Sequence, residues 1–245
     1  MYDNDSPMSS TPLKFGSRDL RLPDDLREPL LEHLEHLKTQ YLNRQWGGRV
    51  GFGKRPAVIV IDLALWWTDP DNNDSQGSDV DSVVESTCQL LEQARAAGVP
   101  IFFTTWDYNQ DYPPSPHDRK LVIDLKPGDE KKFELDPRVN RKENERIIAK
   151  RYASSFKGTN LHKNLAALGI DTLIVTGVST SHCVYATCRD ATDSFRVIVP
   201  RQAVGERCEI MHLVNLLDID IDLGDVVDLD EVITYIKGLA HEKDA

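Results

Sequence analysis

The chain has 245 residues, of which 40% are apolar and 28% are charged, as in ordinary folded globular proteins. This length allows one large α/β domain or at most two small ones. The formal net charge of −11 argues against long-range attraction to nucleic acid or to an anionic membrane surface. No apolar run is long enough for a signal-peptide core or a membrane span, and the four cysteines form no C-x-x-C pair. We therefore expect a cytoplasmic protein with reduced thiols.

The first part of the chain, residues 1–50, is expected to be an extension of a single domain that spans 51–245. Residues 1–16 are rich in Ser, Pro, Asp and Asn, a composition typical of a mobile segment. Between residues 24 and 42, leucines recur at three- and four-residue spacing among charged residues, which predicts an amphipathic helix. We expect this helical arm to cover the core or to contact a second subunit.

The body of the chain alternates short apolar runs with segments of helical periodicity. Strands are expected over 57–62, 100–105, 146–150, 171–177, 196–199 and 226–227, and helices over 80–97, 159–168, 182–193, 206–217 and 229–240. This alternation predicts a three-layer α/β/α fold with a central parallel sheet of about six strands. Residues 107–144 form a long irregular insert with five prolines, which we expect to cover the functional site or a neighbouring subunit.

Three reactive side chains are expected at the carboxyl ends of the strands, where open parallel sheets bind their ligands. Asp62 and Lys150 end two strands, and Cys183 lies in the first turn of the helix that follows a third strand. The partial positive charge of a helix N-terminus and a nearby lysine both favour thiolate over thiol. Each residue also has an ordinary structural explanation, as a helix cap, a solvated cation or a packed thiol.

The three residue types fit together chemically. The sulfur can attack a carbonyl carbon, and the carboxylate can take the thiol proton and return it to a leaving amine. The lysine can orient the carboxylate, and backbone N–H groups of the 179–183 turn can bind the oxyanion. The sequence thus suggests acyl transfer to sulfur, release of ammonia or an amine, and hydrolysis of the resulting thioester.

The order and spacing of several motifs carry a family resemblance. They are GFGKRPA at 51–57, VID at 60–62, KRYASSF at 150–156, VTGVSTSHCV at 175–184 and AVGER at 203–207. With these motifs the chain resembles the isochorismatase-like cysteine hydrolases, which have a Rossmann-like fold, and most closely their N-carbamoylsarcosine amidohydrolase branch.

The resemblance implies roles for particular residues. It implies a catalytic triad of Asp62, Lys150 and Cys183, and a cis peptide between Val178 and Ser179. The N–H groups of Ser179 and Cys183 would then form the oxyanion hole. The resemblance also implies that the arginine at position 207, Arg207, binds a substrate carboxylate, and that the chain forms dimers or tetramers.

The chain departs from this branch at two positions beside the cysteine. His182 stands where the branch often has Gly, and Tyr185 stands where it often has Arg. Nicotinamidases, a sister branch, can carry His before the cysteine, but they bind a metal through an Asp-x-His motif. Here Leu63 and Ala64 follow Asp62, and no histidine lies between residues 37 and 116, so we expect neither a metal site nor a cofactor. We interpret His182 as a pocket wall or a hydrogen-bonded spacer.

Three tryptophans follow the first two strands, and they either pack in the core or form a wall of the acyl pocket. The substrate-binding candidates are Arg207, Thr180, His182, Trp67, Trp106 and Tyr185. We expect hydrolysis of a small linear amide or ureido compound, such as an N-carbamoyl amino acid, a maleamate-like half-amide or a ureide. The alternatives are a related hydrolase of another amide, lactam or vinyl ether, and a non-catalytic interaction scaffold. A nucleotide-binding domain is disfavoured, because no G-x-G-x-x-G follows the first strand.

Overall fold

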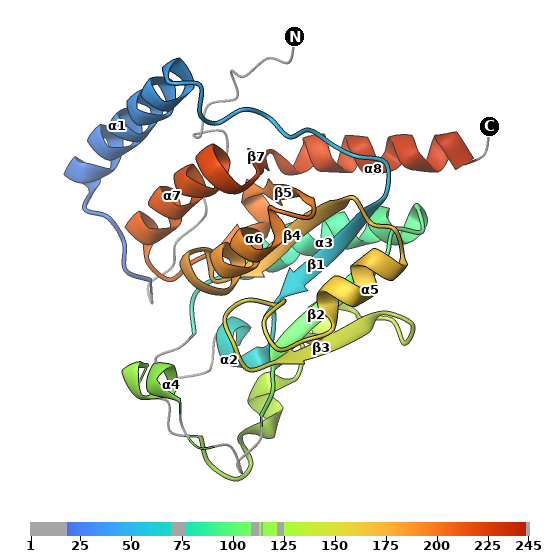
Figure 1. The fold of residues 1–245 in the computed structure, drawn as a ribbon. Coiled ribbons are helices and arrows are strands. Elements are labelled where there is room, and N and C mark those ends of the chain that lie inside the picture. Colours follow the sequence, from blue (N-terminus) through green and yellow to red (C-terminus); the bar gives the residue numbers. More distant parts are fainter. Residues whose placement is uncertain (1–18, 70–76, 109–112, 114, 122–124, 244–245) are drawn as a thin grey trace.

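The computed structural model describes residues 19–69, 77–108, 113, 115–121 and 125–243. Segment 1–16, expected to be mobile, lies outside these residues. The described part contains a seven-stranded sheet in the order β3-β2-β1-β4-β5-β7, with β6 paired to β4 (Figure 1). All of its strand pairs are parallel. The strands are β1 (Pro56–Ile61), β2 (Ile101–Trp106), β3 (Arg146–Lys150), β4 (Thr172–Val178), β5 (Arg196–Pro200), β6 (Val204–Gly205) and β7 (Asp225–Val227).

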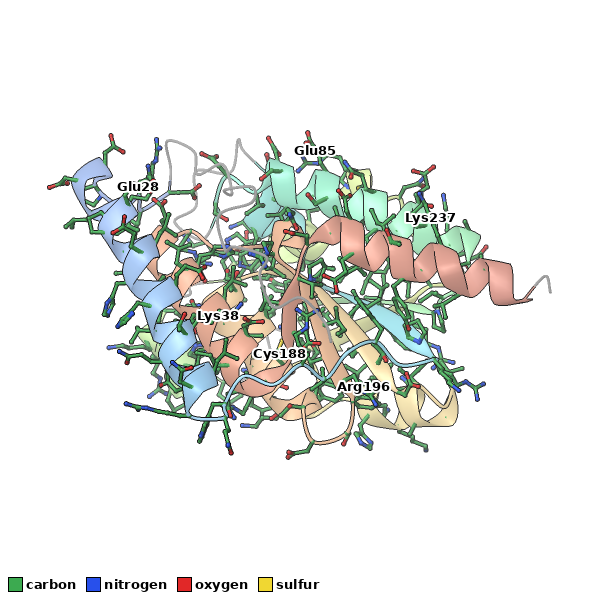
Figure 2. All side chains as sticks on the ribbon, turned by 90° about the horizontal axis from the view of Figure 1, so that it is seen from above. Glu28, Lys38, Glu85, Cys188, Arg196 and Lys237 are labelled. Atoms are coloured by element: carbon green, nitrogen blue, oxygen red, sulfur yellow. The ribbon has the colours of Figure 1, made fainter. Side chains whose placement is uncertain are left out.

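Helices cover both faces of the sheet. They are α1 (Asp24–Asn43), α2 (Leu65–Thr68), α3 (Asp81–Ala96), α4 (Pro116–Lys120), α5 (Leu161–Ala167), α6 (Tyr185–Ala191), α7 (Glu209–Asp218) and α8 (Leu229–Lys243). Helices α3 and α8 lie side by side on one face, where Figure 2 labels Glu85 and Lys237. Helices α5, α6 and α7 cover the other face. The predicted three-layer α/β/α fold is confirmed.

The pleat of β1 shows how one strand supplies both halves of the core. Val58 and Val60 pack among the residues of α3 and α8, whereas Ile59 and Ile61 pack among those of α5 and α6. Because both faces are buried, the strand is apolar throughout, as parallel strands usually are. The prediction of about six strands missed only β6, which has two residues and therefore no readable periodicity.

The carboxyl ends of β1 and β4 approach each other closely. Gly177 has a φ of +102°, and a Cβ atom at this position would collide with the carbonyl oxygen of Ile61. Glycine is therefore required where these strands end. The next residue of β1, Asp62, also has a positive φ, of 51°. Non-glycine residues rarely adopt this conformation, so the surrounding structure must hold it in place.

Helix α1 forms an arm along α7 and the turn that follows it (Figure 1). Its predicted extent agrees with the structure to within one residue at its end. Arg27 Nε lies 2.7 Å from Glu209 Oε1. Lys38, labelled in Figure 2, extends to Asp220, with 2.9 Å between Nζ and Oδ2. Leu34 is fully buried, whereas Leu26 and Tyr41 are exposed, so only the middle of the apolar stripe packs against the body of the protein.

The insert after β2 contains α4 and two 3₁₀ turns, Asp129–Phe133 and Pro137–Val139. Helix α4 begins at a capping box, in which Ser115 Oγ accepts from the Asp118 N–H and Asp118 accepts from the Ser115 N–H. Figure 1 places α2 and α4 at the end of the sheet toward which β1 and β2 point. Within the described residues, no helix is long and apolar enough to cross a membrane.

Candidate active site

Asp62, Lys150 and Cys183 meet at the carboxyl edge of the sheet. Lys150 Nζ lies 2.7 Å from Asp62 Oδ2 and 3.3 Å from Cys183 Sγ. In the strand order, β2 separates β3 from β1, so the long lysine stem spans the end of β2 to reach the aspartate. The predicted convergence of an acid, an amine and a thiol from separate strand ends is present in the structure.

Asp62 is fixed by a residue that the sequence analysis did not identify. Thr104, in β2, donates a hydrogen bond from Oγ1 to Asp62 Oδ1 at 2.7 Å, and the same oxygen accepts the Asp62 N–H at 3.2 Å. One carboxylate oxygen of Asp62 thus contacts Thr104, and the other contacts Lys150. The sequence could have indicated this role, because Thr104 is a hydroxyl residue within an apolar strand. A fully buried hydroxyl group usually makes a hydrogen bond.

The charges around Cys183 shift the pKa of its thiol in the direction opposite to the one expected from the sequence. Burial and the adjacent Asp62 carboxylate raise the pKa of Cys183 to about 12, although Lys150 opposes this shift. Burial alone would lower the pKa of Lys150, but Asp62 and Cys183 outweigh it and the net shift is upward. This upward shift of the Cys183 pKa runs against the expected thiolate. Desolvation disfavours a second anion beside Asp62, so these surroundings favour the thiol form of Cys183.

The turn that carries the nucleophile begins at a cis peptide between Val178 and Ser179, as the resemblance implied. One π-helical turn, Thr180–Val184, follows and leads into α6. Thr180 does not line the pocket, contrary to our expectation of a substrate contact. Its hydroxyl is buried and donates to the Gly205 carbonyl at 3.0 Å, and it lies 2.8 Å from His212 Nδ1. Thr180 thus connects the nucleophile turn to β6 and α7.

Glu206 is a second residue whose part the sequence analysis missed. Its buried carboxylate accepts the N–H and the hydroxyl of Ser181, at 3.0 and 2.6 Å, through one oxygen. The other oxygen accepts the Arg207 N–H at 2.9 Å. Burial would raise the pKa of Glu206, but the nearby His182 and the hydrogen bonds from Ser181 lower it to about 2. Glu206 therefore connects the nucleophile turn to the arginine.

A small pocket of about 50 Å³ opens above the cluster. Asp62 and Cys183 lie at it, and its walls include four predicted substrate contacts, Trp67, Trp106, His182 and Arg207. The Arg207 guanidinium also donates to Ser179 Oγ at 3.1 Å. These residues come from α2, the end of β2, the nucleophile turn and the segment after β6.

Two further pocket residues come from the insert, and Tyr185, like Thr180, is a predicted contact that does not line the pocket. His117 and Leu121, in and just after α4, line the pocket. No periodic pattern pointed to them, and only the length of the insert suggested a functional loop. Tyr185 does not line the pocket: its hydroxyl donates to Asp218 at 2.5 Å and its ring packs against the core beside α6. Tyr185 is two residues after Cys183, and its side chain points toward Asp218 in α7.

Among the residues that the structure describes, no group of three or more His, Cys, Asp or Glu side chains is arranged to hold a metal ion. All four cysteines are free thiols.

The parallel sheet and the cluster of Asp62, Lys150 and Cys183 place the chain among α/β proteins with a cysteine at the end of a strand. Sequence comparison identifies the family. The Isochorismatase domain model matches residues 56–231, so the chain belongs to the isochorismatase family. It is 36% identical over 244 residues to N-carbamoylsarcosine amidase of Arthrobacter sp, covering 97% of this chain and 90% of that protein. It is 35% identical over 202 residues to maleamate amidohydrolase of Pseudomonas putida, covering 80% of this chain and 93% of that one.

Solved structures agree on the fold. A cysteine hydrolase from Pseudomonas syringae superposes with a TM-score of 0.70 at 24% identity, covering 78% of this chain and 97% of that chain. N-carbamoylsarcosine amidase from Thermoplasma acidophilum superposes with a TM-score of 0.61, also at 24% identity, covering 72% of this chain and 97% of that chain.

Proposed function

We propose that the protein is an amidohydrolase that cleaves a C–N bond of a small linear amide or ureido compound and releases ammonia. The observation that carries this proposal is the contact of Lys150 with both Asp62 and Cys183 at the floor of a pocket. The names of two relatives, N-carbamoylsarcosine amidase and maleamate amidohydrolase, support the same reaction class.

The first half of the reaction forms an acyl-enzyme. Cys183 Sγ attacks the substrate carbonyl carbon, and the thiol proton moves to the Asp62 carboxylate as the S–C bond forms. The raised pKa of Cys183 means that this proton leaves only when a nearby base receives it, and Asp62 is that base. Lys150 stays protonated and offsets the negative charge of the cluster.

The second half releases the products. The tetrahedral intermediate collapses, Asp62 returns the proton to the leaving nitrogen, and ammonia departs. Water, deprotonated by Asp62, then attacks the thioester, and the sulfur regains its proton as the acid leaves. The oxyanion of both intermediates would be held by the N–H groups of Ser179 and Cys183.

Arg207 suggests which small amides fit. Its guanidinium lines the same pocket as Cys183, donates a hydrogen bond to Ser179 Oγ and has Nε 4.0 Å from Glu206 Oε1, so it is a cation that faces a substrate. A carboxylate at the far end of the substrate would pair with it. The small pocket and the indole rings of Trp67 and Trp106 favour a compact substrate, such as an N-carbamoyl amino acid or a maleamate-like half-amide.

A panel of amides and ureides, assayed for ammonia, tests this proposal. Cys183→Ala should abolish ammonia release, whereas Cys208→Ala, a cysteine at the start of α7, should leave it unchanged. Ammonia release by Cys183→Ala at the wild-type rate would contradict the thiol mechanism. A wild-type protein inactive on the whole panel would instead favour the interaction scaffold.

We also propose that the chain forms a homodimer or tetramer. Helix α7 presents Ile210, Met211 and Val214 at its surface, each more than two-fifths exposed. Apolar side chains gathered in this way on one helix favour a contact with a second copy. Light scattering coupled to size exclusion measures the mass directly, and a monomer at micromolar concentration would contradict the proposal. The cytoplasmic location stays a prediction.

A further inference from the structure

A chain of hydrogen bonds fixes the proton of a pocket histidine, and it starts at Glu206. The Glu206 side chain is 1% exposed, and as an ionised carboxylate it can only accept hydrogen bonds. Ser181 Oγ lies 2.6 Å from Glu206 Oε2, so the single hydroxyl proton of Ser181 points to the carboxylate. The Ser181 oxygen then has only lone pairs left to offer to other partners.

The next contact in this chain is with His182. Its Nδ1 lies 2.8 Å from Ser181 Oγ. Because the Ser181 proton is already used on Glu206, Nδ1 must carry the proton of this contact. In a neutral imidazole the lone pair then lies on Nε2. Within the described residues, Nε2 has no hydrogen-bond partner, so the ring offers a free acceptor.

The free acceptor belongs to a ring at the substrate pocket. His182 lines the same pocket as Cys183 and Arg207, and its side chain is 43% exposed. It directly precedes the nucleophile, and it shares the Glu206 carboxylate with Arg207. Because these three residues line one pocket, a substrate with its carbonyl at Cys183 and its carboxylate at Arg207 can bring its middle part to this ring.

We propose that His182 determines specificity by accepting, at Nε2, a hydrogen bond from the internal N–H of an N-carbamoyl amino acid. The inference rests on the proposed function and narrows its substrate class. An N-methylated ureido nitrogen, or the carbon of a half-amide, has no proton to donate at this position. Such a substrate would leave His182 Nε2 without a hydrogen-bond donor. Because an unpaired polar group is unfavourable, this would weaken binding of the transition state.

Two substrates that differ by one methyl group test the inference: N-carbamoylglycine, which has the internal N–H, and N-carbamoylsarcosine, which does not. For the wild type we expect kcat/KM to favour N-carbamoylglycine about tenfold, equivalent to roughly 1.4 kcal/mol. His182→Phe, which keeps a planar ring without an acceptor, should bring this ratio to about one by raising KM for N-carbamoylglycine. His182→Gln, whose amide oxygen can accept, should restore part of the preference.

A third variant tests the hydrogen-bond chain itself. Ser181→Ala removes the group that fixes the proton on Nδ1, so the ratio should fall although His182 is intact. Far-UV circular dichroism and thermal unfolding identify any variant that fails to fold. If His182→Phe or Ser181→Ala does not fold, the substrate preference of His182→Gln is compared with that of the wild type.

The outcomes separate this inference from the proposed function. Equal or better turnover of N-carbamoylsarcosine by the wild type, or an equal loss on both substrates in His182→Phe, overturns the inference and makes the ring a plain wall. A wild type that hydrolyses neither these compounds nor any half-amide overturns the proposed function itself, and the inference with it.

Discussion

Lys150 and Asp62 form an ion pair with 2.7 Å between Nζ and Oδ2, and their side chains are only 1% and 3% exposed. Removing two charges from water costs free energy that the pair only partly recovers, and apolar replacements of such pairs are often neutral or stabilising. Stability alone therefore does not account for this pair. Its contact with the Cys183 sulfur explains why charges are held at the end of an otherwise apolar sheet.

The opposite effects of these two charges on Cys183 lead to a first prediction. Asp62 raises the pKa of the thiol and Lys150 lowers it. Asp62→Asn should therefore speed alkylation of Cys183 by iodoacetamide at pH 8, and Lys150→Met should slow it, each by about tenfold or more. Both variants should lose ammonia release by at least about a hundredfold, because the proton acceptor or its partner is gone.

Mass spectrometry of the peptide that contains Cys183 measures the alkylation rate, and Cys208 in the same digest is the internal control. Removing one partner of a buried pair destabilises a protein by about 3–5 kcal/mol, so the rates are compared at a temperature where both variants are folded. Slower alkylation in Asp62→Asn would contradict the charge arrangement.

Glu206 should contribute to acid stability. Its pKa falls from an ordinary 4.5 to about 2 in the folded protein. A carboxyl group with a lowered pKa stabilises the fold above its unfolded value, and this contribution is lost as the pH falls from about 4.5 to 2. The loss should approach about 3 kcal/mol. Urea unfolding at several pH values should give a flatter acid limb for Glu206→Gln than for the wild type, and parallel curves would contradict the prediction.

His212 should act in a higher pH window. Burial lowers its pKa from 6.5 to about 4, although Glu206 and Glu209 oppose the shift. Between these values the unfolded chain takes up a proton that the folded protein does not. The free energy of unfolding should therefore fall by up to about 3 kcal/mol as the pH drops from 6.5 to 4. His212→Asn should remove this slope and retain the one assigned to Glu206; an unchanged slope would show that His212 is not its source.

Two glycines form a matched pair for stability. Gly177→Ala places a Cβ against the Ile61 carbonyl at a φ of +102°, so we expect a loss of more than about 3 kcal/mol. Gly238→Ala adds a Cβ in open space on helix α8, so we expect a gain of roughly 0.5–1 kcal/mol from helix propensity. Denaturant unfolding measures both variants, and similar values for the two would contradict the steric argument.

The sequence by itself determined the layers of the fold and the position of the reactive cluster. Apolar runs and helical periodicity are local properties of the chain, and a parallel sheet brings its strand ends to one edge. For this reason the sequence alone predicts that Asp62, Lys150 and Cys183 lie together. The family motifs added the cis peptide at Val178 and a pocket position for Arg207.

Only the tertiary structure decided which groups these residues touch. Thr104 on Asp62, His117 at the pocket and Glu206 behind Ser181 are contacts between segments far apart in the chain, which no local pattern encodes. The direction in which the pKa of the Cys183 thiol shifts is also opposite to the one expected from the sequence. A helix N-terminus favours thiolate, but burial beside a carboxylate acts more strongly at this site, and burial is a property of the packed molecule.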